Sequence, residues 1–113
     1  MEVWKKIPNF EDYEVSTMGR VRSNNKIMKL SDNGLGYFQV KLWSNRKMTR
    51  RYIHRIVMET FSPTSKKMEV NHIDHDKGNN RLDNLEWVTH KENLRKAVKF
   101  LGASAFRQRE PAK

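Results

Sequence analysis

Alternating apolar and polar residues mark the clearest strand in the first half of the chain. Between residues 37 and 43, the apolar residues Phe38, Val40 and Leu42 fall on one face, and Lys41 falls on the other. This period of two predicts a half-buried strand. A short hairpin loop follows, and residues 48–53 are predicted to return as the neighbouring strand.

A shorter hairpin and a helix are predicted on either side of this strand pair. Residues 13–16 and 20–23 have the composition of strands joined by a turn that contains Gly19. Apolar residues then follow helical spacing, so residues 52–61 are predicted to form an amphipathic helix that ends before Pro63. This part of the chain is therefore expected to form a small antiparallel sheet packed on one helix.

The remaining residues follow the order strand, loop, strand, helix. The predicted bounds are 68–70 for the first strand, 74–80 for the loop, 85–88 for the second strand and 90–100 for the helix. Thr89 is a good N-cap for this helix, and Glu92 completes a capping box. Trp87 is expected to anchor the second strand in the core, and residues 101–113 are expected to form a flexible basic tail.

Composition narrows the class of protein. A chain of 113 residues with 36% hydrophobic residues fits one compact domain or two very small modules. The chain has no cysteine, which excludes disulfides and cysteine-ligated zinc. No apolar run reaches the ~20 residues of a membrane span, and the N-terminus lacks the apolar run of a signal peptide. We therefore expect an intracellular protein without a membrane partner.

Positive charge is concentrated in residues 20–55. This block holds ten basic residues and a single acidic residue, Asp32, in a chain of net charge +10. Clustered cations favour a nucleic acid as the partner, because they release condensed counterions from phosphates. A solvated face that only keeps the protein soluble is the alternative, and charge alone leaves an RNA partner open.

We expect one basic face of the predicted sheet to bind double-stranded DNA, because a two-stranded ribbon can enter the major groove. The residues assigned to this face are Arg20, Arg22, Lys41, Arg46, Arg50 and Arg51, and Lys47 and Arg55 are further DNA-binding candidates. The three tryptophans are expected to pack rather than to stack on bases. Of these, Trp43 shares its strand face with Lys41.

Residues 69–93 differ from the rest of the chain. They contain six carboxylates but only three basic residues, together with clustered histidines and asparagines. The predicted strand–loop–strand–helix layout brings His72 and Asn93 together. A histidine beside oxygen ligands suits metal-assisted phosphodiester hydrolysis, in which a neutral imidazole takes a proton from water and a divalent cation stabilises charge on the phosphate.

The same segment resembles a known nuclease motif. Residues 69–93, which read EVNHIDHDKGNNRLDNLEWVTHKEN, are similar to the HNH endonuclease motif. The N-terminal stretch WKKIPNFEDYEVSTMGRVRS resembles the module that often precedes this motif in phage and intron-encoded homing endonucleases, and IHRIVMETF resembles the link between them. The resemblance covers roughly residues 2–96, nearly all of the chain that is expected to be ordered.

The resemblance implies a fold, a reaction and a set of residues. It implies an α+β fold with an N-terminal antiparallel β module for DNA binding (1–53), a linking helix with a ββα-metal unit (54–100), and the tail (101–113). It implies hydrolysis of DNA to 3′-hydroxyl and 5′-phosphate ends with one Mg²⁺ or Mn²⁺. The sequence leaves the oligomeric state open, and a monomer is slightly favoured. His72 would be the general base, Asn71 and Asn93 would ligate the metal, and Asn84 would tie the loop between the two strands.

Two positions depart from the family pattern. Many relatives have aspartate where this chain has Asn71, and glycine is common where it has His75. We therefore hypothesise that the metal binds weakly until DNA supplies the scissile phosphate, with Asp74 or Asp76 helping from nearby. The alternative is an HNH-fold DNA-binding or regulatory protein that cuts poorly or not at all.

The other histidines receive structural interpretations. His54 is expected to cap or pack at the start of the linking helix rather than to take part in catalysis, and His90 is expected to face solvent in the first turn of its helix. A zinc site at His72 and His75 is disfavoured, because the chain has no cysteine and the two residues lie at a loop.

Overall fold

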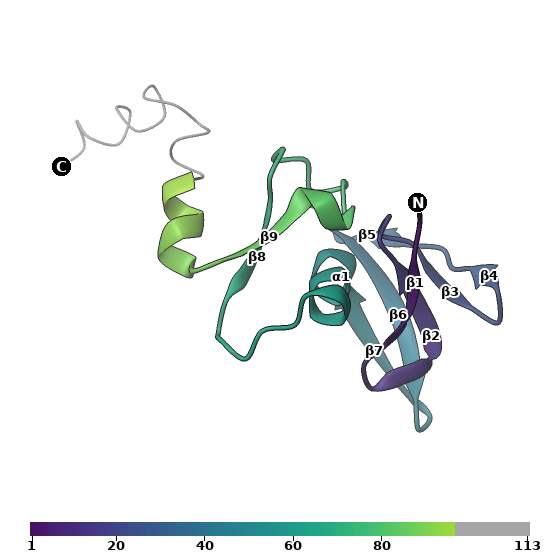
Figure 1. The fold of residues 1–113 in the computed structure, drawn as a ribbon. Helices are drawn as coiled ribbons and strands as arrows, with labels where there is room; N and C mark the ends of the chain where they lie inside the picture. Colours follow the sequence, from purple (N-terminus) through teal and green to yellow (C-terminus); the bar gives the residue numbers. More distant parts are fainter. Residues whose placement is uncertain (97–113) are drawn as a thin grey trace.

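The computed structural model of the chain describes residues 1–96 (Figure 1). Within them the strands form three antiparallel sheets, and a helix over residues 90–96 follows the last strand. The elements are β1 (Trp4–Ile7), β2 (Phe10–Ser16), β3 (Val21–Ser23), β4 (Lys26–Ile27), β5 (Ser31–Asp32), β6 (Phe38–Ser44), β7 (Lys47–Tyr52), α1 (Ile53–Phe61), β8 (Glu69–His72), the short 3-10 helix η1 (Leu82–Asn84) and β9 (Leu85–Val88). The predicted α+β fold class is confirmed.

The N-terminal strands divide into two sheets rather than the single sheet that we expected. Strands β1 to β4 form the first sheet in chain order, and its turns use residues with positive φ, namely Asn9, Gly19, Asn24 and Asn25. Strand β1 was not predicted because its less exposed residues, Trp4 and Ile7, lie three positions apart. A register shift between Lys6 and Ile7 breaks the period of two on which strand prediction relies.

The second sheet consists of β5, β6 and β7, and its β6–β7 hairpin has the predicted alternation. Val40 and Leu42 are buried, whereas Lys41 is exposed. The turn residues Asn45 and Arg46 have φ angles of 52° and 65°, as a tight two-residue hairpin requires. Trp43 is 56% exposed, so our expectation that it packs was wrong. It lies on the outer face of the hairpin, where the alternation puts it.

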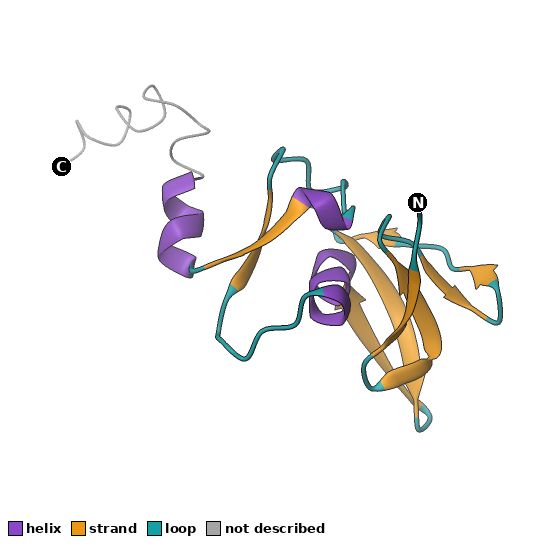
Figure 2. Cartoon of the chain, viewed as in Figure 1, coloured by secondary structure: helices purple, strands orange, loops and turns teal. Residues whose placement is uncertain are grey.

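Helix α1 lies at the centre of the fold, between the N-terminal sheets and the β8–β9 hairpin (Figure 2). Its buried face carries Ile53, Ile56 and Val57, each of which stabilises the fold by about 1.5–3 kcal/mol. The helix contacts β1, β2, β6 and β7, and it also contacts β8, β9 and η1. One continuous core therefore runs from Ile7 to Leu85, and the hairpin that carries His72 rests on it.

The C-terminal helix begins with the predicted capping box. The backbone N–H of Glu92 donates to Thr89 Oγ1 at 3.1 Å, and the Thr89 N–H donates to Glu92 Oε1 at 3.0 Å. The part of this helix predicted at residues 97–100, and the tail predicted at 101–113, lie outside the described residues. Among the described residues, no helix has the length and apolar character needed to cross a membrane.

Candidate active site

His72 ends strand β8 and is held by one buried hydrogen bond. Its side chain is only 6% exposed, and its Nε2 lies 2.8 Å from Oδ1 of Asn80. An amide oxygen only accepts hydrogen bonds, so His72 Nε2 must carry the proton in this contact. In the neutral ring Nδ1 then holds the free lone pair. The structure therefore leaves Nδ1 as the basic nitrogen of His72.

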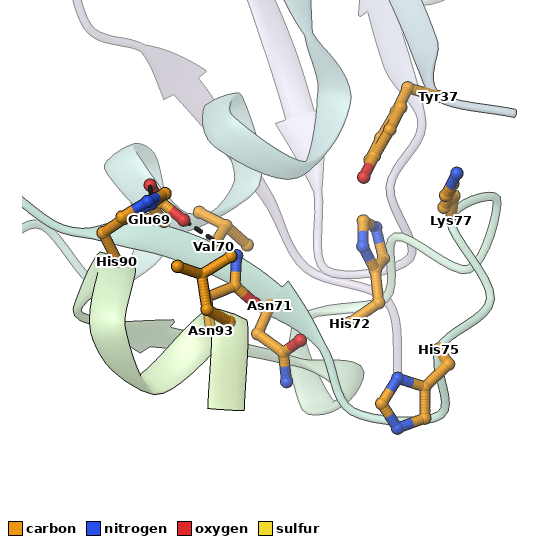
Figure 3. Close-up of a pocket in the computed structure, with 10 residues that line it drawn as sticks. Tyr37, Glu69, Val70, Asn71, His72, His75, Lys77, His90 and Asn93 are labelled. Atoms are coloured by element: carbon orange, nitrogen blue, oxygen red, sulfur yellow. Dashed lines mark hydrogen bonds and ion pairs between the residues drawn. The ribbon is translucent and has the colours of Figure 1, made fainter. Parts of the chain in front are cut away.

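Aromatic rings surround His72. The Tyr37 ring lies 6.1 Å from it, and the His54 ring lies 5.2 Å away in an edge-on arrangement. The Tyr37 side chain extends toward His72 in Figure 3. The rings of Tyr37 and Tyr52 pack against His54, so the prediction that His54 packs is confirmed. The residue capping α1 is Tyr52 rather than His54.

His54 is an uncharged histidine near neutral pH. Burial, with smaller contributions from electrostatic repulsion by His72 and Arg55, lowers the pKa of His54 from 6.5 to about 4. Its Nδ1 is buried and has no hydrogen-bond partner in the described part of the chain. A charged His54 would place a positive charge beside the candidate base His72, and the burial of His54 disfavours that charge.

Asn84 connects both ends of the loop that follows His72. Its Oδ1 accepts from the Asp74 N–H at 3.1 Å, and its Nδ2 donates to Asp74 Oδ1 and to the Asn79 carbonyl, both at 2.9 Å. Its backbone carbonyl accepts from the Ile73 N–H at 2.8 Å. Asn84 is 8% exposed, and its side-chain hydrogen bonds are partly buried. They fix the loop between β8 and β9.

The two loop carboxylates that we expected to help a metal are used within the loop instead. Asp74 Oδ2 accepts from Asn79 Nδ2 at 2.8 Å, and Asp76 Oδ1 accepts from the Gly78 N–H at 2.9 Å. Hydrogen bonds from Asn79, from the backbone of Asp76 and from Asn84 lower the pKa of Asp74. Neither carboxylate lines the cleft beside His72, and this arrangement does not support our metal hypothesis for Asp74 and Asp76.

Asn71 and Asn93 line that cleft together with His72 (Figure 3). The cleft is open and has a volume of about 430 Å³. Asn71 Nδ2 donates to Glu86 Oε2 at 2.7 Å, and Asn93 Nδ2 donates to Glu69 Oε1 at 2.8 Å. Because a carboxylate binds each amide nitrogen, each side chain presents its Oδ1 away from that contact. Amide oxygens are ligands for hard cations such as Mg²⁺.

The negative charge of this segment lies beside the two asparagines rather than on them. Glu69 Oε2 also lies 2.6 Å from Nδ1 of His90, and hydrogen bonds from Asn93 and then from His90 lower the pKa of Glu69. His90 is exposed, as predicted, but this contact was not foreseen. Within residues 1–96, no three His, Cys, Asp or Glu side chains form a metal-binding group. The side-chain oxygens of Asn71 and Asn93 beside the cleft are neutral.

The candidate DNA-binding cations do not form the single face that we expected. Lys41 and Arg50 are opposite each other on the outer face of the β6–β7 hairpin, and both are exposed. Neighbouring residues of a strand point to opposite faces, so Arg51 does not share the outer face with Arg50. Arg51 lies opposite buried Val40 in the register and pairs with Glu59 of α1. Our assignment of Arg50 and Arg51 to one face is therefore corrected.

The other candidate cations are divided in the same way. Arg46 and Lys47 are exposed at and beside the hairpin turn. Arg55 is bound by the Met68 carbonyl at 3.1 Å and by Glu59 at 3.2 Å. In the first sheet, ion pairs join Arg20 to Glu2 and Arg22 to Glu14, and both guanidinium groups lie over the Trp4 ring. The freely exposed set is Lys41, Arg46, Lys47 and Arg50.

Sequence reasoning missed three residues of the site: Glu69, Glu86 and Asn80. Glu86 lies directly opposite Asn71 in the β8–β9 register, so antiparallel pairing of the two predicted strands was a usable signal. Asn80 gave no comparable signal, because an asparagine in a loop is common chemistry there. Its contact with His72 depends on the path of the whole loop.

Two family models match the chain. Residues 51–95 match the model described as HNH endonuclease, and residues 2–43 match the model described as the NUMOD4 motif. The uncharacterized HNH endonuclease L247 of Acanthamoeba polyphaga mimivirus is 46% identical over 106 residues, which cover 86% of this chain and 26% of that protein. The DNA endonuclease I-HmuI of Bacillus phage SP01 is 35% identical over 95 residues, covering 80% of this chain and 55% of that protein.

A solved structure supports the same similarity. The chain superposes on a solved structure of the HNH homing endonuclease I-HmuI, described as DNA binding and cleavage by that enzyme. The TM-score is 0.82 at 32% sequence identity. The superposition covers 94% of this chain and 64% of that chain. The chain therefore spans only part of the length of each of these relatives.

Proposed function

The chain belongs to the HNH homing endonuclease family, and from this premise we propose that it is a metal-dependent DNA endonuclease with His72 as its general base. The observation that carries the proposal is the hydrogen bond from His72 Nε2 to Asn80, which leaves His72 Nδ1 able to take a proton. Asn71 and Asn93 line the same cleft and offer neutral oxygens to a cation.

The reaction proceeds by attack of water on the scissile phosphorus. His72 Nδ1 takes a proton from the water as the new oxygen–phosphorus bond forms, and the bond from phosphorus to the 3′ oxygen breaks. The leaving oxygen takes a proton from solvent, which gives 3′-hydroxyl and 5′-phosphate ends. One divalent cation, Mg²⁺ or Mn²⁺, held by Oδ1 of Asn71 and of Asn93, would stabilise negative charge on the phosphate and the leaving oxygen.

Glu69 and Glu86 orient the two asparagines in this proposal. Each glutamate accepts from one amide nitrogen, and such outer contacts fix the direction of a ligating group. The two ligands carry no formal charge, so affinity for a free cation stays low until a DNA phosphate completes the site. Calorimetry with Mg²⁺ or Mn²⁺ should detect weak binding to the protein alone; tight binding without DNA contradicts this step.

DNA binding is assigned to the outer face of the β6–β7 hairpin. Its exposed cations, Lys41, Arg46, Lys47 and Arg50, can each approach a phosphate without breaking an internal contact. Arg20 and Arg22 are assigned weaker phosphate contacts, because surface ion pairs are readily exchanged. Arg51 and Arg55 are assigned to holding Glu59 and α1 rather than to binding DNA.

The test is cleavage of supercoiled plasmid with Mg²⁺ or Mn²⁺ by the wild type and by His72→Ala. General-base catalysis contributes about 100-fold to 10,000-fold, so His72→Ala should nick the plasmid slower by that factor while DNA affinity stays near that of the wild type. Lys66→Ala, in the exposed loop before β8, is the matched control and should cut normally. Cleavage that survives His72→Ala removes the base assignment.

One observation favours a second function, DNA binding without efficient cleavage. Asn71 stands where many members of the family have aspartate, and its partner Glu86 is itself paired with Lys96 at 3.6 Å. A site with two neutral ligands holds its cation less strongly. Retained DNA affinity with no nicking by the wild type under either metal would support this second function.

A further inference from the structure

Asn80 touches both the candidate base and the N-terminal sheet. Its Oδ1 accepts from His72 Nε2, and the whole residue is 5% exposed. On its other side lies Gly19, in the turn between β2 and β3. A Cβ atom placed on Gly19 would lie 2.8 Å from the Asn80 carbonyl oxygen and 2.9 Å from Asn80 Cβ. Only a hydrogen atom fits between the two residues, so they are in full contact.

The turn that carries Gly19 is rigidly bonded within itself. Ser16 is fully buried, and its Oγ accepts from the N–H groups of Met18 at 3.1 Å and Arg20 at 3.2 Å. The Gly19 N–H donates to the Ser16 carbonyl at 3.0 Å. Gly19 has a φ of 81°, a conformation that glycine adopts without the strain of a side chain. The position of Gly19 is therefore fixed by the turn.

The turn is also bonded to its neighbours on both sides. The Thr17 carbonyl accepts from the Leu82 N–H at 2.8 Å, which joins the turn to η1, two residues after Asn80. The Val3 N–H donates to Thr17 Oγ1 at 3.1 Å, and the Thr17 N–H donates to the Val3 carbonyl at 2.9 Å. The turn is thus held in place by hydrogen bonds where it contacts the loop of the candidate active site.

We propose that the turn of residues 16–20 is part of the catalytic site, acting through Asn80 to position His72. Contact at Gly19 holds Asn80, and Asn80 holds the Nε2–H of His72 so that Nδ1 faces the reacting water. Gly19 and Asn80 are positioning residues, because neither touches the substrate. This inference rests on the proposed role of His72 as general base. It makes one functional unit of two segments that match separate family models.

The test compares two glycine variants that each place a side chain at a positive φ. Gly19 and Gly34 both have positive φ angles, 81° and 93°, but a Cβ on Gly34 has no atom within 4 Å. Gly19→Ala should lower the cleavage kcat by about 10-fold to 100-fold with little change in KM, because a small displacement of the base is costly. Gly34→Ala should cut at the wild-type rate. Equal rates for the two variants, both folded, overturn the proposal.

A spectroscopic readout follows His72 without DNA or metal. In ¹⁵N-labelled protein, the buried and hydrogen-bonded Nε2–H proton of His72 should exchange slowly with water in the wild type and in Gly34→Ala. It should exchange rapidly in Gly19→Ala and in Asn80→Ala. Asn80→Asp keeps an acceptor oxygen in place, so it should restore slow exchange and recover much of the cleavage rate lost in Asn80→Ala.

Two outcomes decide the proposal even where a variant folds poorly. Slow exchange and a normal kcat in Asn80→Ala overturn the link to His72. If Gly19→Ala does not fold, Thr17→Val loosens the same turn by removing only the hydroxyl bound to Val3, and unchanged exchange in Thr17→Val overturns the role of the turn. Because the exchange measurement needs no cleavage, a wild type that fails to cut DNA leaves this test intact and contradicts only the proposed function.

Discussion

The loop after His72 and the β6–β7 hairpin both belong to the proposed DNA-processing surface. They differ in how far their polar side chains are buried and hydrogen-bonded. The segment after His72 buries two polar residues, Asn80 and Asn84, and these bond to groups of the same segment or of strand β8. The hairpin buries only one face. Its outer face exposes Lys41, Trp43 and Arg50 to solvent.

The difference matches the roles that we propose for the two regions. A general base must lie within a fraction of an ångström of its proper place, and buried hydrogen bonds supply that precision. A phosphate contact needs only a long cation within reach, so a flexible side chain serves it well. Substitutions in the loop should therefore lower stability and kcat, and those on the hairpin should change DNA affinity with little loss of stability.

The largest effect is expected at Asn84. Asn84→Ala removes three side-chain hydrogen bonds of a buried residue, which join it to part-buried groups of Asp74 and Asn79. Each such hydrogen bond contributes about 0.5–1.5 kcal/mol, so the free energy of unfolding should fall by about 2–4 kcal/mol. Urea denaturation measures the change.

Asn79→Ala is the matched control within the same loop. Its side chain makes one hydrogen bond, to Asp74 Oδ2 in an exposed position. The expected loss is about 1 kcal/mol or less, because water replaces the lost partner. Equal losses for the two variants would show that burial in the loop does not distinguish them, and the contrast with the hairpin would weaken.

The next effect is a pH dependence centred on His54. Its ring is packed by Tyr37 and Tyr52, and the titratable groups that face it are His72 of β8 and Arg55 of α1. Its folded pKa of about 4 lies below the unfolded value of 6.5, so the folded state resists protonation. The contribution of neutral His54 to the free energy of unfolding is fully present above the unfolded pKa, and it is lost as the pH falls from 6.5 toward 4.

A variant with no titrating group at position 54 isolates the contribution of His54 to the pH dependence of stability. Between about pH 7.5 and about pH 5, the His54 term should lower the free energy of unfolding by about 2 kcal/mol. His54→Phe keeps an aromatic ring but has no titrating nitrogen. The pH dependence measured by denaturation at both values should therefore be smaller in His54→Phe by that amount. An unchanged pH dependence would mean that His54 is not neutralised by burial.

The alternation of residues predicted the parts of the fold that follow a regular period. The β6–β7 hairpin, helix α1 and the capping box at Thr89 were predicted because each depends on residues close together in sequence. Strand β1 escaped prediction because a register shift breaks its period. The division of the strands into two sheets also escaped, because it depends on packing around α1 rather than on any local pattern.

The candidate site likewise contains residues that the sequence predicted and contacts that it did not predict. His72, Asn71 and Asn93 were named from a resemblance that rests on residue types at fixed spacing. The contact between Asn80 and Gly19 joins residues far apart in the sequence, and no spacing rule predicts it. The expectation of one basic face failed because it treated two neighbouring arginines alike, although a strand points them to opposite sides.

Arg50 and Arg51 provide the next comparison, since they are neighbours with different surroundings. Arg50→Ala removes an exposed cation and should reduce the slope of log affinity against log salt by about one unit, with stability unchanged. Arg51→Ala breaks the pair with Glu59 and should mainly lower stability, by about 1 kcal/mol or less. Fluorescence anisotropy over a salt series and thermal unfolding measure the two effects. A larger change of slope in Arg51→Ala would place the DNA on the other face.

The smallest effect is expected at the hairpin turn, where Arg46 is held in a left-handed conformation with a φ of 65°. A side chain there is strained, and Asn-Gly is the preferred sequence for such a turn. Arg46→Gly should therefore raise the free energy of unfolding by about 0.5–1 kcal/mol. If Arg46 binds a phosphate, the same variant should bind DNA more weakly and with a smaller salt slope.

Lys47→Gly is the control for this last prediction, because Lys47 begins strand β7 and is not among the residues with positive φ. It removes an equivalent exposed charge but should lower stability, since glycine weakens a strand. A gain of stability in Arg46→Gly together with a loss of DNA affinity would show that the hairpin keeps a strained cation at its tip for binding. A gain with unchanged affinity would remove Arg46 from the DNA-binding set and restrict that set to the strands.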